Sequence, residues 1–122
     1  MESILKSIKK LLGISDDETH FDSDLIMHIN SVFAILNQLG VGPSKSFSIQ
    51  DDTAVWDDFI EDDPNFNDVK TYIYLKVRLL FDPPANSSVL SAMERQISEL
   101  EWRLNVSAYS KSMEETDDDG VS

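Results

Sequence analysis

Seven acidic side chains within the segment 51–63 are the largest group of potential metal ligands: Asp51, Asp52, Asp57, Asp58, Glu61, Asp62 and Asp63. Carboxylate oxygens suit calcium, but a calcium loop places its oxygen ligands at fixed positions around a turn glycine. These acids follow no such register. We therefore interpret them as an acidic surface that faces solvent or a partner, and we expect neither a metal nor a cofactor.

The histidines, lysines and serines that could bind a metal or phosphate or act as nucleophiles also lack the spacing that such sites require. His20 and His28 are not spaced as a zinc pair, and the chain has no cysteine to complete a site. The segment Gly40–Ser46 superficially resembles a phosphate loop, but that motif requires a glycine directly before Lys45, where this chain has Ser44. No nucleophile motif surrounds any serine. The sequence therefore predicts a protein that is not an enzyme.

The charge of the chain is strongly negative and unevenly distributed. The 122 residues carry a formal net charge of −13, from 23 acids and 10 bases. Residues 1–12 carry +2, residues 13–68 carry −12, residues 69–111 carry +2 and residues 112–122 carry −5. Such a surface repels nucleic acid at long range. It fits a basic protein partner, a DNA mimic or simply a soluble protein.

The pattern of apolar residues predicts two helices joined by a corner, at about 68–81 and 88–106. The first is apolar around most of its circumference, which indicates a helix in the middle of a bundle. The second has a narrow apolar seam of the coiled-coil type. Pro83 and Pro84 fix the corner, and Asn86 or a neighbouring serine caps the second helix. The expected core of this hairpin is Val69, Ile73, Val77, Leu80, Leu90, Met93, Ile97, Leu100 and Leu104.

Two further helices precede the hairpin, at about 2–12 and 23–39. Gly13 and Gly40 follow their last apolar residues and are expected to end them. The first is amphipathic, with its lysines expected opposite or beside the apolar face, and Asp22 or Ser23 is expected to cap the second. The sequence thus predicts an all-α fold, a small bundle of about four helices, with no stretch long enough to cross a membrane.

The segment 41–66 allows two interpretations. Either a short helix near residues 53–60 packs Trp56 and Phe59 onto the bundle, or the segment orders against a neighbouring molecule. The candidate contacts with a partner or with another subunit are Trp56, Phe59, Ile60, Trp102 and Tyr109. Residues 1–110 are expected to form one helical domain, and residues 111–122 a flexible acidic tail.

The order of these features resembles that of the small all-helical head–tail connector proteins (adaptor or head-completion proteins) of tailed bacteriophages. The resemblance begins with the amphipathic segment Ile4–Gly13, the acidic step Ser15–Asp17 and the helix Asp24–Gly40. It continues in Val69–Pro84 and in the segment Met93–Leu104. It covers about the whole chain except the tail, and its motifs are patterns of helix and turn.

The resemblance implies a structural virion protein, made in the cytoplasm of the bacterial host. By this resemblance the protein is expected to form a twelvefold ring with copies of itself, between the portal protein and the tail or stopper (neck) proteins. The ring extends the DNA channel without binding DNA specifically. Cyclic symmetry then requires two different faces of each subunit to meet. The alternative is an acidic DNA mimic or inhibitor that occupies a basic site on another protein.

Overall fold

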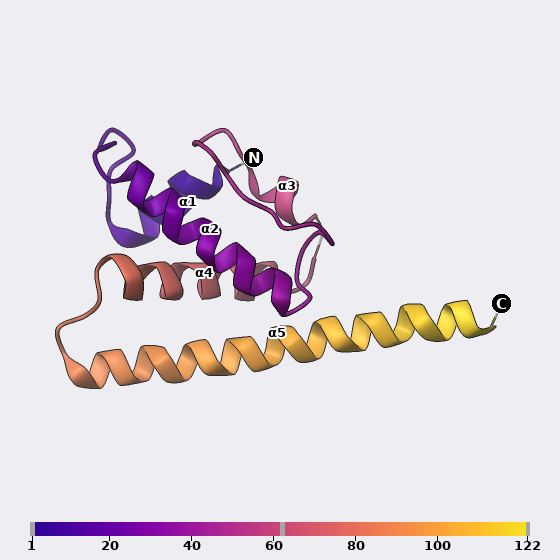
Figure 1. Cartoon of the computed structure of the whole chain (residues 1–122). Coiled ribbons are helices and arrows are strands. Elements are labelled where there is room, and N and C mark those ends of the chain that lie inside the picture. Colours follow the sequence, from indigo (N-terminus) through magenta and orange to yellow (C-terminus); the bar gives the residue numbers. More distant parts are fainter. Residues whose placement is uncertain (1, 62, 122) are drawn as a thin grey trace.

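The computed structural model describes residues 2–61 and 63–121, with side chains as far as Ser110. Five helices follow one another along the chain, and the described part contains no strand: α1 (Ile4–Leu12), α2 (Asp22–Gln38), α3 (Trp56–Phe59), α4 (Phe66–Phe81) and α5 (Ser87–Val121). The prediction of an all-α fold is confirmed. The four expected main helices are present, and α3 is a short addition to them (Figure 1).

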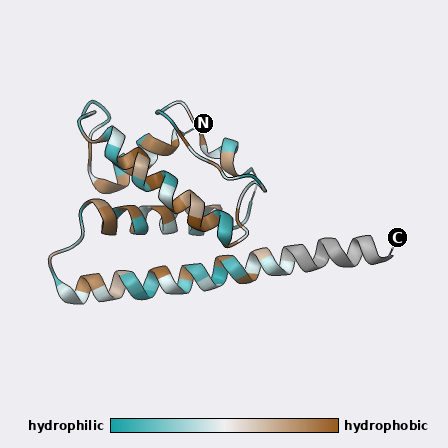
Figure 2. Cartoon of the chain, viewed as in Figure 1, coloured by the Kyte–Doolittle hydropathy of each residue, from teal (hydrophilic) through white to brown (hydrophobic). Residues whose placement is uncertain are grey.

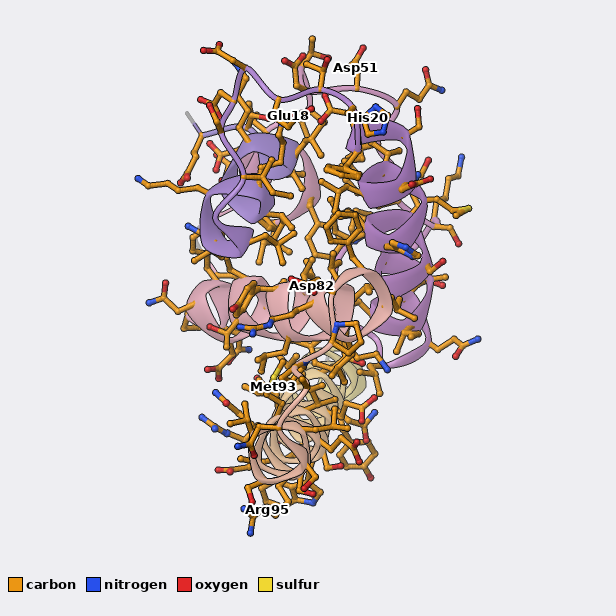
Figure 3. The ribbon with its side chains drawn as sticks, turned by 90° about the vertical axis from the view of Figure 1, so that its left-hand side faces the viewer. Glu18, His20, Asp51, Asp82, Met93 and Arg95 are labelled. Atoms are coloured by element: carbon orange, nitrogen blue, oxygen red, sulfur yellow. The ribbon has the colours of Figure 1, made fainter. Side chains whose placement is uncertain are left out.

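Helix α4 lies in the middle of the molecule, as its nearly continuous apolar surface predicts. It contacts α1, α2 and α5. Figure 3 shows the resulting layers, with α1 and α2 beside each other on one side of α4 and α5 on the other. Apolar residues concentrate where α1, α2 and α4 meet, whereas the coloured part of α5 is mostly polar with isolated apolar turns (Figure 2).

The hairpin core is largely as expected, with two differences. Val69, Ile73, Val77, Met93, Ile97, Leu100 and Leu104 are all buried. Leu80 shares a helix face with Val77, yet it is 52% exposed because it lies in the last turn of α4, where the chain leaves the bundle. Its assignment to the core is therefore wrong. Leu90, in the first turn of α5, is half-buried.

Helix α1 contains a buried lysine where an exposed one was expected. Gly13 ends α1 in the left-handed conformation, with φ 81°, as predicted. Lys9, however, is only 2% exposed. Its ammonium donates to the backbone oxygens of Asp16 (3.3 Å) and Glu18 (2.6 Å) and pairs with Asp22 Oδ1 at 2.9 Å. Asp22 is thus a helical residue that binds Lys9 and does not cap α2.

The segment between α2 and α4 packs onto its own bundle, which confirms the first of the two interpretations. Ile49 is buried, and the side-chain amide of Asn30 pairs with both its backbone N–H (2.8 Å) and its carbonyl (2.9 Å). Backbone hydrogen bonds from Ile4 to Ala54 (3.0 Å) and from Trp56 to Glu2 (3.4 Å) attach the segment to the start of α1. These bonds satisfy polar groups that burial would otherwise leave unpaired.

Helix α5 is longer than the sequence suggested. The Asn86 side chain accepts hydrogen bonds from the N–H groups of Ser88 (2.8 Å) and Val89 (3.2 Å), so Asn86 is the cap. The helix does not end near Val106 but continues past the rest of the bundle (Figure 1). The flexible tail expected at residues 111–122 lies outside the residues whose side chains are described, and it stays a prediction.

Removing the Ile97 side chain should destabilise the protein. Ile97 is 6% exposed and lies in the seam that joins α5 to the bundle. We expect Ile97→Ala to lower the free energy of unfolding by about 2–3 kcal/mol, since the truncation removes buried contacts and leaves a cavity. Urea denaturation measures the effect, with Val106→Ala, on the exposed side of the same helix, as the control. Equal midpoints for both variants would contradict this packing.

Candidate functional site

The residues weighed for chemistry lie apart from one another. In the described ranges, no group of three or more acidic or histidine side chains is placed to hold a metal ion. His20 is exposed and stacks edge-on against Phe21, with ring centroids 4.9 Å apart. His28 is half-buried on α2. The exposed acidic and aromatic surfaces are therefore the remaining candidates for a functional site.

Two of the candidate partner contacts are core residues instead. Trp56 is 1% exposed, and its indole N–H donates to Ser7 Oγ at 2.9 Å. Phe59 is 5% exposed and packs against Phe33, with ring centroids 4.6 Å apart. Assigning Trp56 and Phe59 as partner contacts is therefore wrong for the folded subunit, because α3 turns both inward. Ile60 is half-buried and packs against the same core.

Gly42 allows this inward turn. Its φ is +90°, a conformation that favours glycine. A Cβ at this position would overlap the Phe59 ring. Gly42, which belongs to the segment that superficially resembles a phosphate loop, thus makes room for the Phe59 ring.

The acidic residues of 51–63 are mostly exposed, and several order their own loop. Asp58 accepts a hydrogen bond from the Val55 N–H at 3.0 Å, and the half-buried Asp63 accepts one from the Asn65 N–H at 2.7 Å. Asp52 lies 3.8 Å from the Lys6 ammonium. The remaining described members are exposed, namely Asp51, Asp57 and Glu61, and Asp62 lies outside the described residues. These acids thus form a loop surface, and its partner stays a prediction.

The two most exposed of the large aromatic residues in the described chain, Trp102 and Tyr109, lie on the outer face of α5. Trp102 is 67% exposed, Val106 40% and Tyr109 65%. Their spacing of four and three residues places them on one face of the helix. Leu100 and Leu104, two residues on either side of Trp102, point about 160° away from it toward α4. We call Trp102, Val106 and Tyr109 the outer stripe. Trp102 and Tyr109 remain candidate contacts.

Polar contacts hold the helix that carries the outer stripe against the bundle. The Tyr72 hydroxyl donates to Glu101 Oε2 at 2.8 Å, and Asn65 Nδ2 donates to Ser107 Oγ at 2.7 Å. Burial, and then the hydrogen bond and charge of Glu101, raise the pKa of Tyr72 far above its ordinary value. The buried phenol therefore stays protonated, and the stripe lies on a firmly attached helix.

This pKa shift predicts that stability falls in strong base. Because folding raises the pKa of Tyr72, its contribution is complete below the unfolded value of about 10 and is lost as the pH rises above it. We expect the free energy of unfolding to decrease above about pH 10 by up to about 1.4 kcal/mol per pH unit from this group. Urea denaturation between pH 8 and 11, compared with Tyr72→Phe, isolates the contribution. Parallel curves for the two proteins would disprove it.

The comparison with known families decides the class of this protein. A family model described as a phage connector protein matches residues 4–111, from the first residue of α1 to just beyond the outer stripe. The chain belongs to the phage connector protein family. No curated protein and no solved structure matches it.

Family membership confirms the resemblance inferred from the helix and turn patterns. This phage connector is a structural component of a virion, and its family is not a family of enzymes. It interacts with components of the phage head or tail. Within the described residues, none of its helices is long and apolar enough to span a membrane.

Proposed function

We propose that this phage connector forms a closed ring between the portal protein and the tail or neck proteins, and that the ring extends the DNA channel. The main observation in support of the proposal is that α5 has two different sides. One side of the helix is the seam on α4, and the opposite side exposes two aromatic residues. Exposed aromatic side chains of this kind are typical of interface cores.

The charge of the subunit suits a channel through which DNA must move. A basic wall would hold DNA by attraction, whereas an acidic wall does not retain it. The acidic loop around Asp51, Asp57 and Glu61 is exposed and is one candidate for the lining. The net charge of −13 also opposes assembly of free subunits. We therefore propose that the portal, which gathers subunits at high local concentration, templates the ring.

Sedimentation with portal-containing heads across a salt series tests the proposal. We expect heads to capture a fixed multiple of subunits, and added salt to favour oligomers because it screens the repulsion between them. The alternative, an acidic DNA mimic, requires a basic partner, and its complex would weaken steeply with salt. Failure to bind heads, together with salt-sensitive binding to a nucleic-acid enzyme, would replace the connector proposal by the mimic.

A further inference from the structure

Six of the eight exposed large hydrophobic residues of the described chain fall into two separate groups. The described large hydrophobic residues that are exposed are Leu11, Phe21, Met27, Leu80, Val89, Trp102, Val106 and Tyr109. The last three are the outer stripe. Phe21, Leu80 and Val89 lie where α2 begins, where α4 ends and where α5 begins. The aromatic rings of Phe21 and the half-buried Phe81 are in contact there, with centroids 5.3 Å apart. We call Phe21, Leu80, Phe81 and Val89 the corner patch.

The two patches face different directions and lie far apart. Val89 precedes Trp102 by thirteen residues and Tyr109 by twenty, which corresponds to about 20–30 Å along α5. Figure 1 shows the corner between α4 and α5 at one end of the molecule, with the rest of α5 leading away from it. Figure 3 looks onto this end and shows Asp82, at the end of α4, close to the viewer.

The outer stripe also faces away from the subunit's own core. In Figure 3, Arg95 of α5 points away from α4, whereas Met93 lies on the side of α4. Trp102 follows Arg95 by two helical turns and therefore lies on the same outer side. Most of the stripe is uncovered, since Trp102 and Tyr109 are each about two-thirds exposed, and Tyr109 borders a shallow pocket with Leu39 and Gly40 at the end of α2.

A low density of charge distinguishes the outer stripe, and the part of the corner patch formed by Leu80, Phe81 and Val89, from the rest of the acidic chain. Residues 102–110 contain a single charged side chain, Arg103. Arg103 binds Glu99 (3.2 Å) and Asp68 (3.6 Å) of its own subunit. Residues 78–93 contain one base, Arg78, and one acid, Asp82. Subunits that each carry −13 approach one another with least repulsion through surfaces of this kind.

We infer that the outer stripe of one subunit docks against the corner patch of a second copy of this chain. A closed ring requires two different patches on each subunit that fit each other, and these patches supply such a pair. Contact between two identical patches would instead stop at a dimer. Trp102 and Tyr109 act as the anchors, because large aromatic side chains bury much area at low entropic cost. This inference rests on the proposed ring and names its interface.

Paired cysteines test the contact, because the natural chain contains none. Val89 and Val106 are a matched pair of exposed valines, 45% and 40% exposed, one in each patch. The double variant Val89→Cys/Val106→Cys is treated with a short bis-maleimide on portal-containing heads and, at high salt and high concentration, in solution. We expect a ladder of multimers beyond the dimer, because each cross-link leaves another reactive patch free. Ser46→Cys/Val106→Cys, with the exposed Ser46 outside both patches, is the control and should give no ladder.

The results separate this interface from the proposed ring itself. Dimers from Val106→Cys alone, a cross-link to a head protein, or equal ladders in the test and control pairs would overturn the inference. So would the absence of a ladder under both conditions. If heads still capture a fixed multiple of subunits, the connector proposal stands while this interface fails. Failure to bind heads at all counts against the proposed function instead.

Substitution of the anchors gives a second, independent measurement. We expect Trp102→Ala/Tyr109→Ala to lower the amount of protein captured by heads by about tenfold or more. Its urea midpoint should stay unchanged, since both side chains are exposed. Met27→Ala, which removes a 59% exposed side chain outside both patches, is the matched control. Equal losses of capture in the two variants would overturn the assignment of the outer stripe.

Discussion

Trp56→Ala should be among the most destabilising single substitutions in this connector, lowering the free energy of unfolding by about 3–5 kcal/mol. Trp56 is 1% exposed and lies against Phe66, with ring centroids 5.5 Å apart. Truncation removes these contacts and leaves a large cavity. It also leaves the buried Ser7 hydroxyl without its indole partner. A loss of this size is a large part of the stability of a small domain.

The second tryptophan is a natural control for the first. Trp102 is 67% exposed, so Trp102→Ala should change the free energy of unfolding by less than about 0.5 kcal/mol. Denaturation of both variants, followed by circular dichroism, measures the difference. Similar losses for the two variants would show that α3 does not hold Trp56 in the core. In that case, the segment between α2 and α4 would be ordered by a neighbouring molecule instead.

The sequence predicted the helices well because their apolar spacing and end signals agree. Gly13 ends α1, Asn86 caps α5, and α4 is buried on most sides, all as expected. The apolar pattern predicts too early an end for α5, because the apolar seam stops at Leu104, whereas the helix itself continues. A helix that projects beyond its bundle needs no core-facing residues, so periodicity does not report its length.

Contacts between residues that are far apart in the sequence could not be predicted from local patterns of residue types. The Asn30 amide satisfies the backbone of Ile49, nineteen residues away, and the Trp56 indole reaches Ser7 from forty-nine residues away. Nothing in the spacing of these residues links them. The sequence therefore left open whether Trp56 faces the bundle or a partner. The exposure of Trp102, two residues from the seam, likewise depends on α5 packing mainly against one helix, α4.

The spacing of residues in α1 indicates that Lys9 lies on the buried face, although its charge favours an exposed position. Lys9 lies four residues after Leu5 and three before Leu12, so the three share one helix face. Leu5 is buried and Leu12 half-buried, which places the lysine stem among apolar side chains. The ammonium reaches three oxygen acceptors, on Asp16, Glu18 and Asp22. Because an ammonium has three N–H donors, this set can satisfy all of them.

Lys9→Met tests what the buried ammonium contributes. The substitution keeps most of the stem volume but removes the charge that holds the segment between α1 and α2. It leaves the Asp22 carboxylate, whose side chain is 27% exposed, without its cation. We expect a loss of about 3 kcal/mol, at the low end for a broken buried pair because water still reaches Asp22. Urea denaturation measures the loss, and amide hydrogen exchange should show weaker protection in α1 and at the start of α2.

Lys10→Met provides the matched comparison, because it removes the same charge from an exposed position on the same helix. A surface charge of this kind contributes little, so we expect a change within about 0.5 kcal/mol. Lowering the net positive charge of α1 is common to both variants, and it therefore cancels in the comparison. Equal effects of the two substitutions would show that Lys9 acts through general electrostatics. A much larger effect of Lys9→Met would instead establish that one ammonium, bound by three specific oxygens, fixes how α2 enters the bundle.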